Sequence, residues 1–178
     1  MSTNENERKS FKFSTKHVTT IALLSALSVV CSMFLTIRGG DIMKFSPVFI
    51  VIALAARRYG VIGACIVASI TDIIQFLMFP ANGFSFGIFF ANLLSGLIFG
   101  LLFYKKINLT RITLASALSQ MICTVGITTF TMVYIEKWYP TLESIIYFRL
   151  LQALIMFVVN IIFLYLLFIK IDIAKLAK

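Results

Sequence analysis

The residues best able to do chemistry in this sequence are polar side chains set within long apolar runs. Asp72, Gln75, Asn92 and Arg149 each interrupt such a run. An ionisable side chain is expensive in hydrocarbon, so Asp72 is a functional candidate by default. Gln75 lies one helical turn away on a similar face, which favours a shared role. The alternative for Asp72 is a structural carboxylate bound by a neighbouring helix.

The other polar residues also have two interpretations. Asn92 and Gln120 are of the type that forms hydrogen bonds between membrane helices, or they contact a ligand. Arg149 lies about one turn into the last apolar run, where its guanidinium either extends to the headgroups or binds a ligand carboxylate through two hydrogen bonds. Aromatic residues around Trp138 favour a belt at the membrane interface, although one ring could stack on a ligand.

The residue patterns of catalytic and metal sites are missing. His17 is the single histidine, which excludes a histidine-based triad and a multi-histidine metal site. There is no P-loop or Gly-x-Gly-x-x-Gly phosphate cradle, so ATP hydrolysis by this chain is not expected. The three cysteines lie in apolar runs and are expected to be free thiols. A small-molecule binder or carrier without cofactor or metal is favoured over an enzyme.

The apolar runs that carry these residues predict an all-α integral membrane protein. The chain has 178 residues, 60% hydrophobic and 13% charged, more apolar surface than a soluble domain of this size can bury. Runs of roughly 17–25 apolar residues recur, the length that crosses a bilayer. We expect a short cytoplasmic tail at 1–16 and one membrane domain at 17–178, multi-pass in the cell membrane, with helices near 17–37, 46–56, 59–78, 84–104, 111–134 and 144–169.

Charge chooses between six crossings and five, because 46–56 and 59–78 could form one long helix. Six crossings with a cytoplasmic N-terminus place 12 of the 16 basic residues on the inner side. Five crossings would put Arg57 and Arg58 in hydrocarbon. The positive-inside rule therefore predicts six helices with both termini in the cytoplasm. Topology explains most of the net charge of +9, so no nucleic-acid partner is expected.

Small residues predict where helices pack closely. Ala22 and Ala26 share one face of the first helix, where another backbone can approach, either within the chain or in a partner. Glycine and alanine at four-residue steps predict tight packing between 59–78 and 84–104. Between the first two helices, the polar loop 38–44 carries Arg38 and Lys44 on the outer side.

The order and spacing of these features resemble the substrate-binding (S) components of energy-coupling factor (ECF) vitamin transporters, folate-specific type. The matching features are Ala22-Leu-Leu-Ser-Ala26, the loop 38–44, Phe45-Ser-Pro47-Val-Phe, Ala55-Ala-Arg-Arg-Tyr59-Gly60, Gly63 and a late Asp72. Many relatives carry Gly-Pro at the turn after the second helix, where this chain has Gly60-Val61. The resemblance covers essentially the whole chain.

The resemblance implies high-affinity binding of one vitamin, here folate, in a cavity near the outer surface. It further implies association with a transmembrane coupling subunit and two ATPase subunits, which hydrolyse the ATP, and toppling in the membrane to release the vitamin inside. In that family the face of Ala22 and Ala26 docks on the coupling subunit, and the loop 38–44 is the gate.

For folate, the expected substrate-binding residues divide by chemistry. Asp72, Gln75 and Asn92 would read the donor and acceptor edge of the pterin, Trp138 would stack on a ring, and Arg149, Arg38 or Lys44 would bind the carboxylates. Three alternatives remain open at this point: an S component for another vitamin or precursor, a small membrane enzyme acting on lipids, and a scaffold without ligand.

Overall fold

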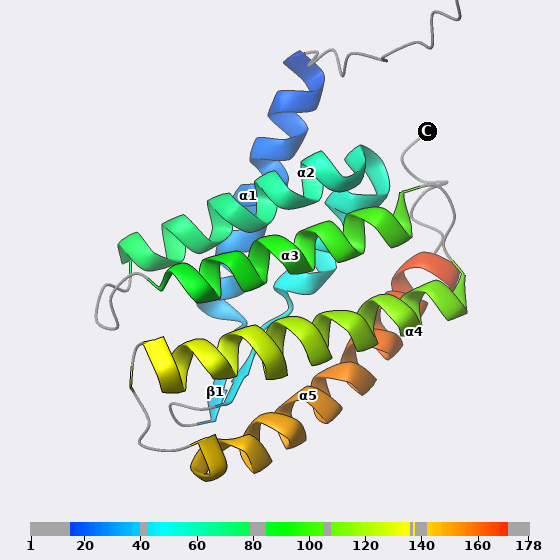
Figure 1. Cartoon of the computed structure of the whole chain (residues 1–178). Coiled ribbons are helices and arrows are strands. Elements are labelled where there is room, and N and C mark those ends of the chain that lie inside the picture. The colour runs from blue at the N-terminus through cyan, green and yellow to red at the C-terminus, as the bar shows by residue number, and fades with distance from the viewer. Residues whose placement is uncertain are drawn as a thin grey trace, which may run out of the picture.

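The structure is a computed structural model that describes residues 15–39, 43–78, 85–104, 108–135, 137 and 142–170. Its α-helices are α1 (Thr15–Phe34), α2 (Val48–Met78), α3 (Phe86–Phe103), α4 (Leu109–Leu118) and α5 (Leu142–Tyr165) (Figure 1). Helix α4 continues into the π-helical segments η2 (Ser119–Thr128) and η3 (Thr131–Ile135), and α5 continues into η4 (Leu166–Lys170). The strands β1 (Ile37–Gly39) and β2 (Met43–Phe45) form a short hairpin between α1 and α2.

The predicted helical membrane protein is confirmed. Within the described ranges, five helices are long and apolar enough to cross a membrane. Two local features differ from the sequence prediction. The expected loop 38–44 is not entirely loop, because its two ends belong to paired strands in which Arg38 lies opposite Lys44. The first helix begins at Thr15, so it includes the last two residues of the expected tail, whose residues 1–14 lie outside the described part.

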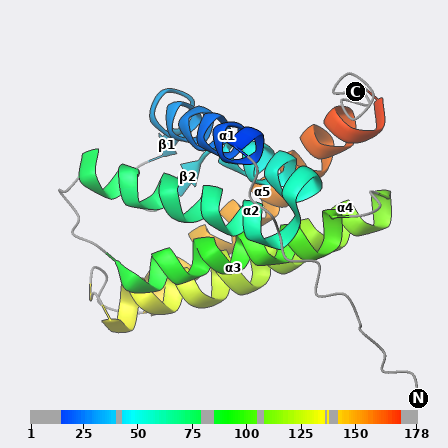
Figure 2. The ribbon, with the colours of Figure 1, turned by 90° about the horizontal axis from the view of Figure 1, so that it is seen from above.

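Helix α2 consists of two helical segments joined at Gly60. This residue has φ 68° and ψ −151°, a conformation open essentially to glycine alone. The chain changes direction there in both views (Figures 1 and 2). The sequence predicted the break at Arg57-Arg58, but those residues lie in the last turn before Gly60. The reason is that an arginine continues a helix as well as most residues do, whereas glycine at positive φ ends it.

Close packing holds α2 and α3 together, as the small residues predicted. A Cβ added at Gly96 would lie 3.1 Å from the carbonyl oxygen of Ala64, and one at Gly100 would lie 2.5 Å from Val61 Cα. Helix α1 packs on α2 through a different kind of small residue, since Ser25, Ser28 and Ser32 form its buried face. The helices also enclose a group of fully buried apolar side chains, which includes Phe99, Phe103, Ile112 and Leu164.

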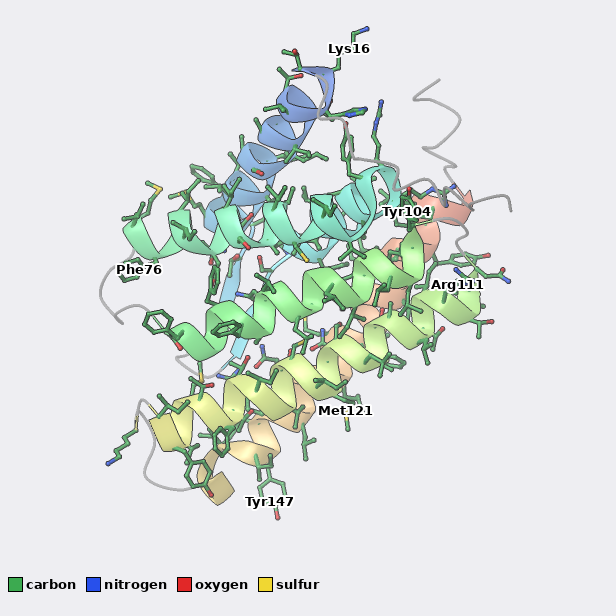
Figure 3. The ribbon with its side chains drawn as sticks, turned by 45° about the horizontal axis from the view of Figure 1, so that its top comes forward. Lys16, Phe76, Tyr104, Arg111, Met121 and Tyr147 are labelled. Atoms are coloured by element: carbon green, nitrogen blue, oxygen red, sulfur yellow. The ribbon has the colours of Figure 1, made fainter. Side chains whose placement is uncertain are left out.

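The bundle has two distinct ends. At the hairpin end lie the last turn of α2, the start of α3, η3, the start of α5 and the β1–β2 hairpin (Figure 1). At the opposite end, which we call the Gly60 end, His17 of α1 contacts the ring of Tyr59 with centroids 5.5 Å apart. Tyr104 and Arg111 lie at this same end, and Phe76 lies at the hairpin end (Figure 3).

Candidate functional site

Helices α2 and α3 are joined by a polar contact in the halves that lie nearer the hairpin end. Asn92 Nδ2 donates a hydrogen bond of 2.7 Å to Asp72 Oδ1, and both side chains are half-buried. A short bond to an ionised acceptor is of the stronger kind. The structure thus brings together two of the predicted site residues and gives Asp72 the neighbouring-helix partner that was its structural alternative. Gln75 lies half-buried one turn closer to the hairpin end.

Arg149 of α5 lies inside the bundle rather than at its surface. Its side chain is only 4% exposed, so the interpretation that it extends to the headgroups is wrong. The guanidinium Nη1 donates to Gln152 Oε1 at 3.4 Å, and Nη2 contacts the thioether sulfur of Met132 in η3. A guanidinium that is buried in this way requires close contacts on every side. Helix α5 therefore presents a fixed planar cation to the interior at the hairpin end.

Gln152 and Met132 are site residues that sequence reasoning missed. Gln152 is as buried as Arg149 and lies three residues further along the same face of α5. The available signal was this i, i+3 spacing of two polar residues in an otherwise apolar run. Met132 gave no signal, because a thioether in an apolar segment is normally a core residue.

The β1–β2 hairpin packs beside α5. Strand β2 contacts α5 directly. At the base of the hairpin, Thr36 Oγ1 donates to Ser46 Oγ at 2.9 Å, which ties its two ends together. The backbone of Arg38 is paired with that of Lys44. The side chains of these two residues, and Trp138 as a whole, lie outside what the structure describes.

Segments η2 and η3 form the wall between α3 and α5. Gln120 is buried, and its Oε1 accepts a hydrogen bond of 3.0 Å from Thr124. The hydroxyls of Thr128 and Thr129 donate to carbonyls five residues back in the chain, the spacing of a π-helix. Their hydrogen-bonding capacity is therefore largely used within their own helix. Gln120 therefore lies in the wall, whereas these two hydroxyls are not candidates for the site.

Two tyrosines near the hairpin end face outward. Tyr147 is 77% exposed and points away from the bundle (Figure 3). Tyr134 is also exposed and stacks on Phe130 of the same helix. Exposed aromatic rings at this level are typical of an interfacial belt. The exposure of these two tyrosines favours the belt interpretation, which stays a prediction.

Two further predictions concern cysteine and the first helix. Cys31, Cys65 and Cys123 are free thiols, as expected, and the described residues contain no cluster of His, Cys, Asp or Glu suited to a metal ion. Ala22 and Ala26 are exposed, on the face of α1 opposite its buried serines. The alternative that these alanines pack within this chain is therefore wrong.

Comparison with known proteins assigns the fold to a family. Residues 16–171 match the family described as ECF transporter, substrate-specific component. The chain belongs to this family. The family is one of transporter subunits and not of enzymes, and this ECF component is a multi-pass protein of the cell membrane.

The ECF component is similar to two folate transporters named FolT. It is 28% identical over 156 residues to FolT of Leuconostoc mesenteroides, covering 84% of this chain and 83% of the relative. It is 24% identical over 146 residues to FolT of Clostridium novyi, with 82% and 83% covered. Its structure is similar to a crystal structure of FolT bound with folic acid, with a TM-score of 0.79 and 27% identity, over 86% of this chain and 93% of that one.

Proposed function

We propose that this ECF component binds folate at its hairpin end and is the substrate-specific subunit for ATP-driven folate uptake. The observation that carries the proposal is Arg149, a guanidinium buried inside the bundle in a fold that closely matches a FolT with folic acid bound. A planar cation held inside a bundle suits a carboxylate ligand, because its two parallel N–H bonds match the two carboxylate oxygens.

Folate has chemistry for each polar group at this end. Its glutamate carries two carboxylates, and Arg149 is proposed as their partner. Arg38 and Lys44, which lie on the hairpin, are proposed as further cations. Asp72 and Asn92, already hydrogen-bonded to each other, present acceptors and donors of the kind that read a pterin edge, with Gln75 one turn away. Trp138 is proposed as a stacking residue.

The break in α2 supports the proposed topology of six crossings with both termini in the cytoplasm. If the segments before and after Gly60 each enter the membrane, α2 contributes two crossings and the chain returns to its starting side. The Gly60 end then faces the cytoplasm. Its basic residues fit that side, since Arg57 lies over the ring of Phe168 and Arg111 bonds to the carbonyl of Leu102 at this end.

The exposed face of α1 is proposed to bind the coupling subunit. Ala22 lies in the half of α1 that is nearer the Gly60 end and Ala26 lies just past the middle of the helix, and both are exposed. Small exposed residues at i, i+4 let a partner helix approach the backbone closely. The coupling subunit and two ATPase subunits would supply the ATP hydrolysis, so this chain itself needs no cofactor.

Equilibrium binding in detergent tests the substrate and the role of Arg149. Folic acid, thiamin and riboflavin are titrated into the purified chain, with Trp138 fluorescence or heat as the readout. Folic acid should bind most tightly, and Arg149→Ala should weaken its binding by about 1.5–3 kcal/mol, the scale of a hydrogen bond to a charged group. Arg58→Ala, an exposed arginine at the opposite end, is the matched control and should leave the affinity unchanged. Equal affinity in Arg149→Ala and wild type would refute the assignment of the carboxylate partner.

The same titration also tests the alternative that the chain is an S component for another vitamin. An S component for another vitamin would show its own ligand as the tightest binder. Thiamin is a cation and is disfavoured by a buried arginine, because like charges in a site of low dielectric repel strongly. Tight thiamin binding with no folic acid binding would therefore overturn the proposal.

A further inference from the structure

Gln152 holds the guanidinium of Arg149 from the same helix. The two residues are three positions apart in α5, which places them on one face, and each is only 4% exposed. Arg149 Nη1 donates to Gln152 Oε1 at 3.4 Å. Because donor and acceptor belong to one helix, the contact directs Nη1 relative to α5 itself.

A second contact reaches the same guanidinium from another helix. Arg149 Nη2 contacts the thioether sulfur of Met132 in η3, and Met132 is itself buried. The planar head is thus contacted at both terminal nitrogens, by an amide and by a thioether. Both groups are uncharged, so neither contact neutralises the arginine. Together they engage two of the five N–H donors that an arginine carries.

The length of the Gln152 contact indicates that it orients the guanidinium more than it binds it. Hydrogen bonds from a guanidinium to a carboxylate are typically about 2.7–2.9 Å long, and they are roughly twice as strong as bonds between neutral groups. The bond from Arg149 to the neutral amide is 3.4 Å long. A ligand carboxylate would therefore bind the guanidinium more strongly than Gln152 does.

A glutamate at position 152 would act in the opposite way. It has nearly the shape of glutamine and would lie equally close to Arg149, but it would form an ion pair with the guanidinium. Opposite charges attract strongly where the dielectric is low. Such an internal pair would offset the charge that a ligand anion needs. Glutamine supplies the acceptor without the negative charge.

We propose that Gln152 is a positioning residue of the binding site, which orients Arg149 and leaves its positive charge available to a carboxylate ligand. This inference rests on the proposed function, in which Arg149 binds a carboxylate of folate. Gln152 acts through Arg149 and not by contact with the ligand. An uncharged acceptor at position 152 thereby makes the site selective for an anion.

Titration of folic acid into variants of the full chain in detergent, followed by calorimetry, tests this role. Gln152→Met keeps the length of the side chain and removes the acceptor, and it is made both in wild type and in Arg149→Ala. Gln152→Glu keeps the acceptor and adds the charge. Leu151→Met is the matched control, because the neighbouring Leu151 is exposed on α5.

The expected pattern couples Gln152 to Arg149. Gln152→Met should raise the Kd for folic acid by about three- to tenfold, the scale of one hydrogen bond. The same change should alter the Kd by less than about twofold when Arg149 is already alanine, since there is then no guanidinium to orient. Gln152→Glu should raise the Kd by about tenfold or more, and Leu151→Met should leave it unchanged.

The other outcomes overturn the inference in distinguishable ways. If wild type binds folic acid and Gln152→Met binds it equally well, the inference fails and the proposed function stands. If Gln152→Met weakens binding equally in both backgrounds, Gln152 acts independently of Arg149, which also overturns the inference. A Gln152→Glu chain that binds as tightly as wild type would refute the role of the missing charge. If this variant does not fold, the two backgrounds of Gln152→Met decide alone. If wild type does not bind folic acid, the proposed function fails and the inference fails with it.

Discussion

Gly60→Ala is the substitution that most directly tests how α2 is built. Gly60 has φ 68°, and an alanine held there is strained. The strain of a non-glycine residue in such a region is of order 1–3 kcal/mol. The new Cβ would also lie 2.8 Å from Tyr104 Cδ2 and 3.0 Å from Cε2. Ordinary carbon contacts are about 3.5–4.0 Å, so the tyrosine ring would have to move.

The two costs act together but can be separated. We expect Gly60→Ala to lower the free energy of unfolding by about 2–4 kcal/mol, the strain plus a typical cost of overpacking. For a chain of this length that corresponds to a fall in Tm of roughly 5–15 °C. Adding Tyr104→Ala should remove the overlap and leave the backbone strain. The double variant should therefore recover part of the loss and not all of it.

The measurement is thermal unfolding in one detergent. It is followed by the fluorescence of a thiol-reactive dye or by the loss of the monodisperse peak in size-exclusion chromatography. Gly126→Ala is the matched control, since that glycine has ordinary helical geometry and an added Cβ would meet only the Met121 carbonyl oxygen at 3.4 Å. Alanine there should be neutral or slightly stabilising. If Gly60→Ala unfolds at the wild-type temperature, α2 does not turn at Gly60, and the support for two crossings in α2 is lost.

Three further predictions follow from contacts in the bundle. Gly87→Ala should destabilise the chain by about 1–3 kcal/mol, because its Cβ would collide with the Thr131 side chain; thermal unfolding should show that Thr131→Ala restores only part of the loss in the double variant, since Thr131 Cβ itself would lie 2.8 Å from the new Cβ. Asn92→Leu should lower the free energy of unfolding by about 1–3 kcal/mol, because it leaves Asp72 without this hydrogen bond. The double variant Asn92→Leu with Asp72→Leu should recover stability, as measured by thermal unfolding. Ala26→Leu should reduce folate uptake in cells that carry the coupling and ATPase subunits while leaving binding by the isolated chain intact; unimpaired uptake would contradict docking through this face of α1.

Asp72 and Arg149 show how far polar residues in apolar runs can be interpreted from sequence. Both were marked as candidates because charge in hydrocarbon needs a reason. Their surroundings could not be deduced, because partners come from other helices at distances that a linear pattern does not encode. The structure pairs Asp72 with Asn92. It also turns Arg149 inward onto Met132 and Gln152, where the sequence left both the inward and the surface orientation open.

Composition, charge and spacing by themselves determined that this is a helical membrane protein with polar residues set within its apolar runs and small residues for packing. These properties follow from the cost of exposing polar groups to lipid, which acts on each segment separately. Only the tertiary structure decided where α2 breaks, because a left-handed glycine, and not the arginine pair, sets the turn. It also decided which face of α1 remains free and that Arg149 of α5 lies inside the bundle. Both depend on how neighbouring helices rotate against one another, and periodicity within one helix does not specify that rotation.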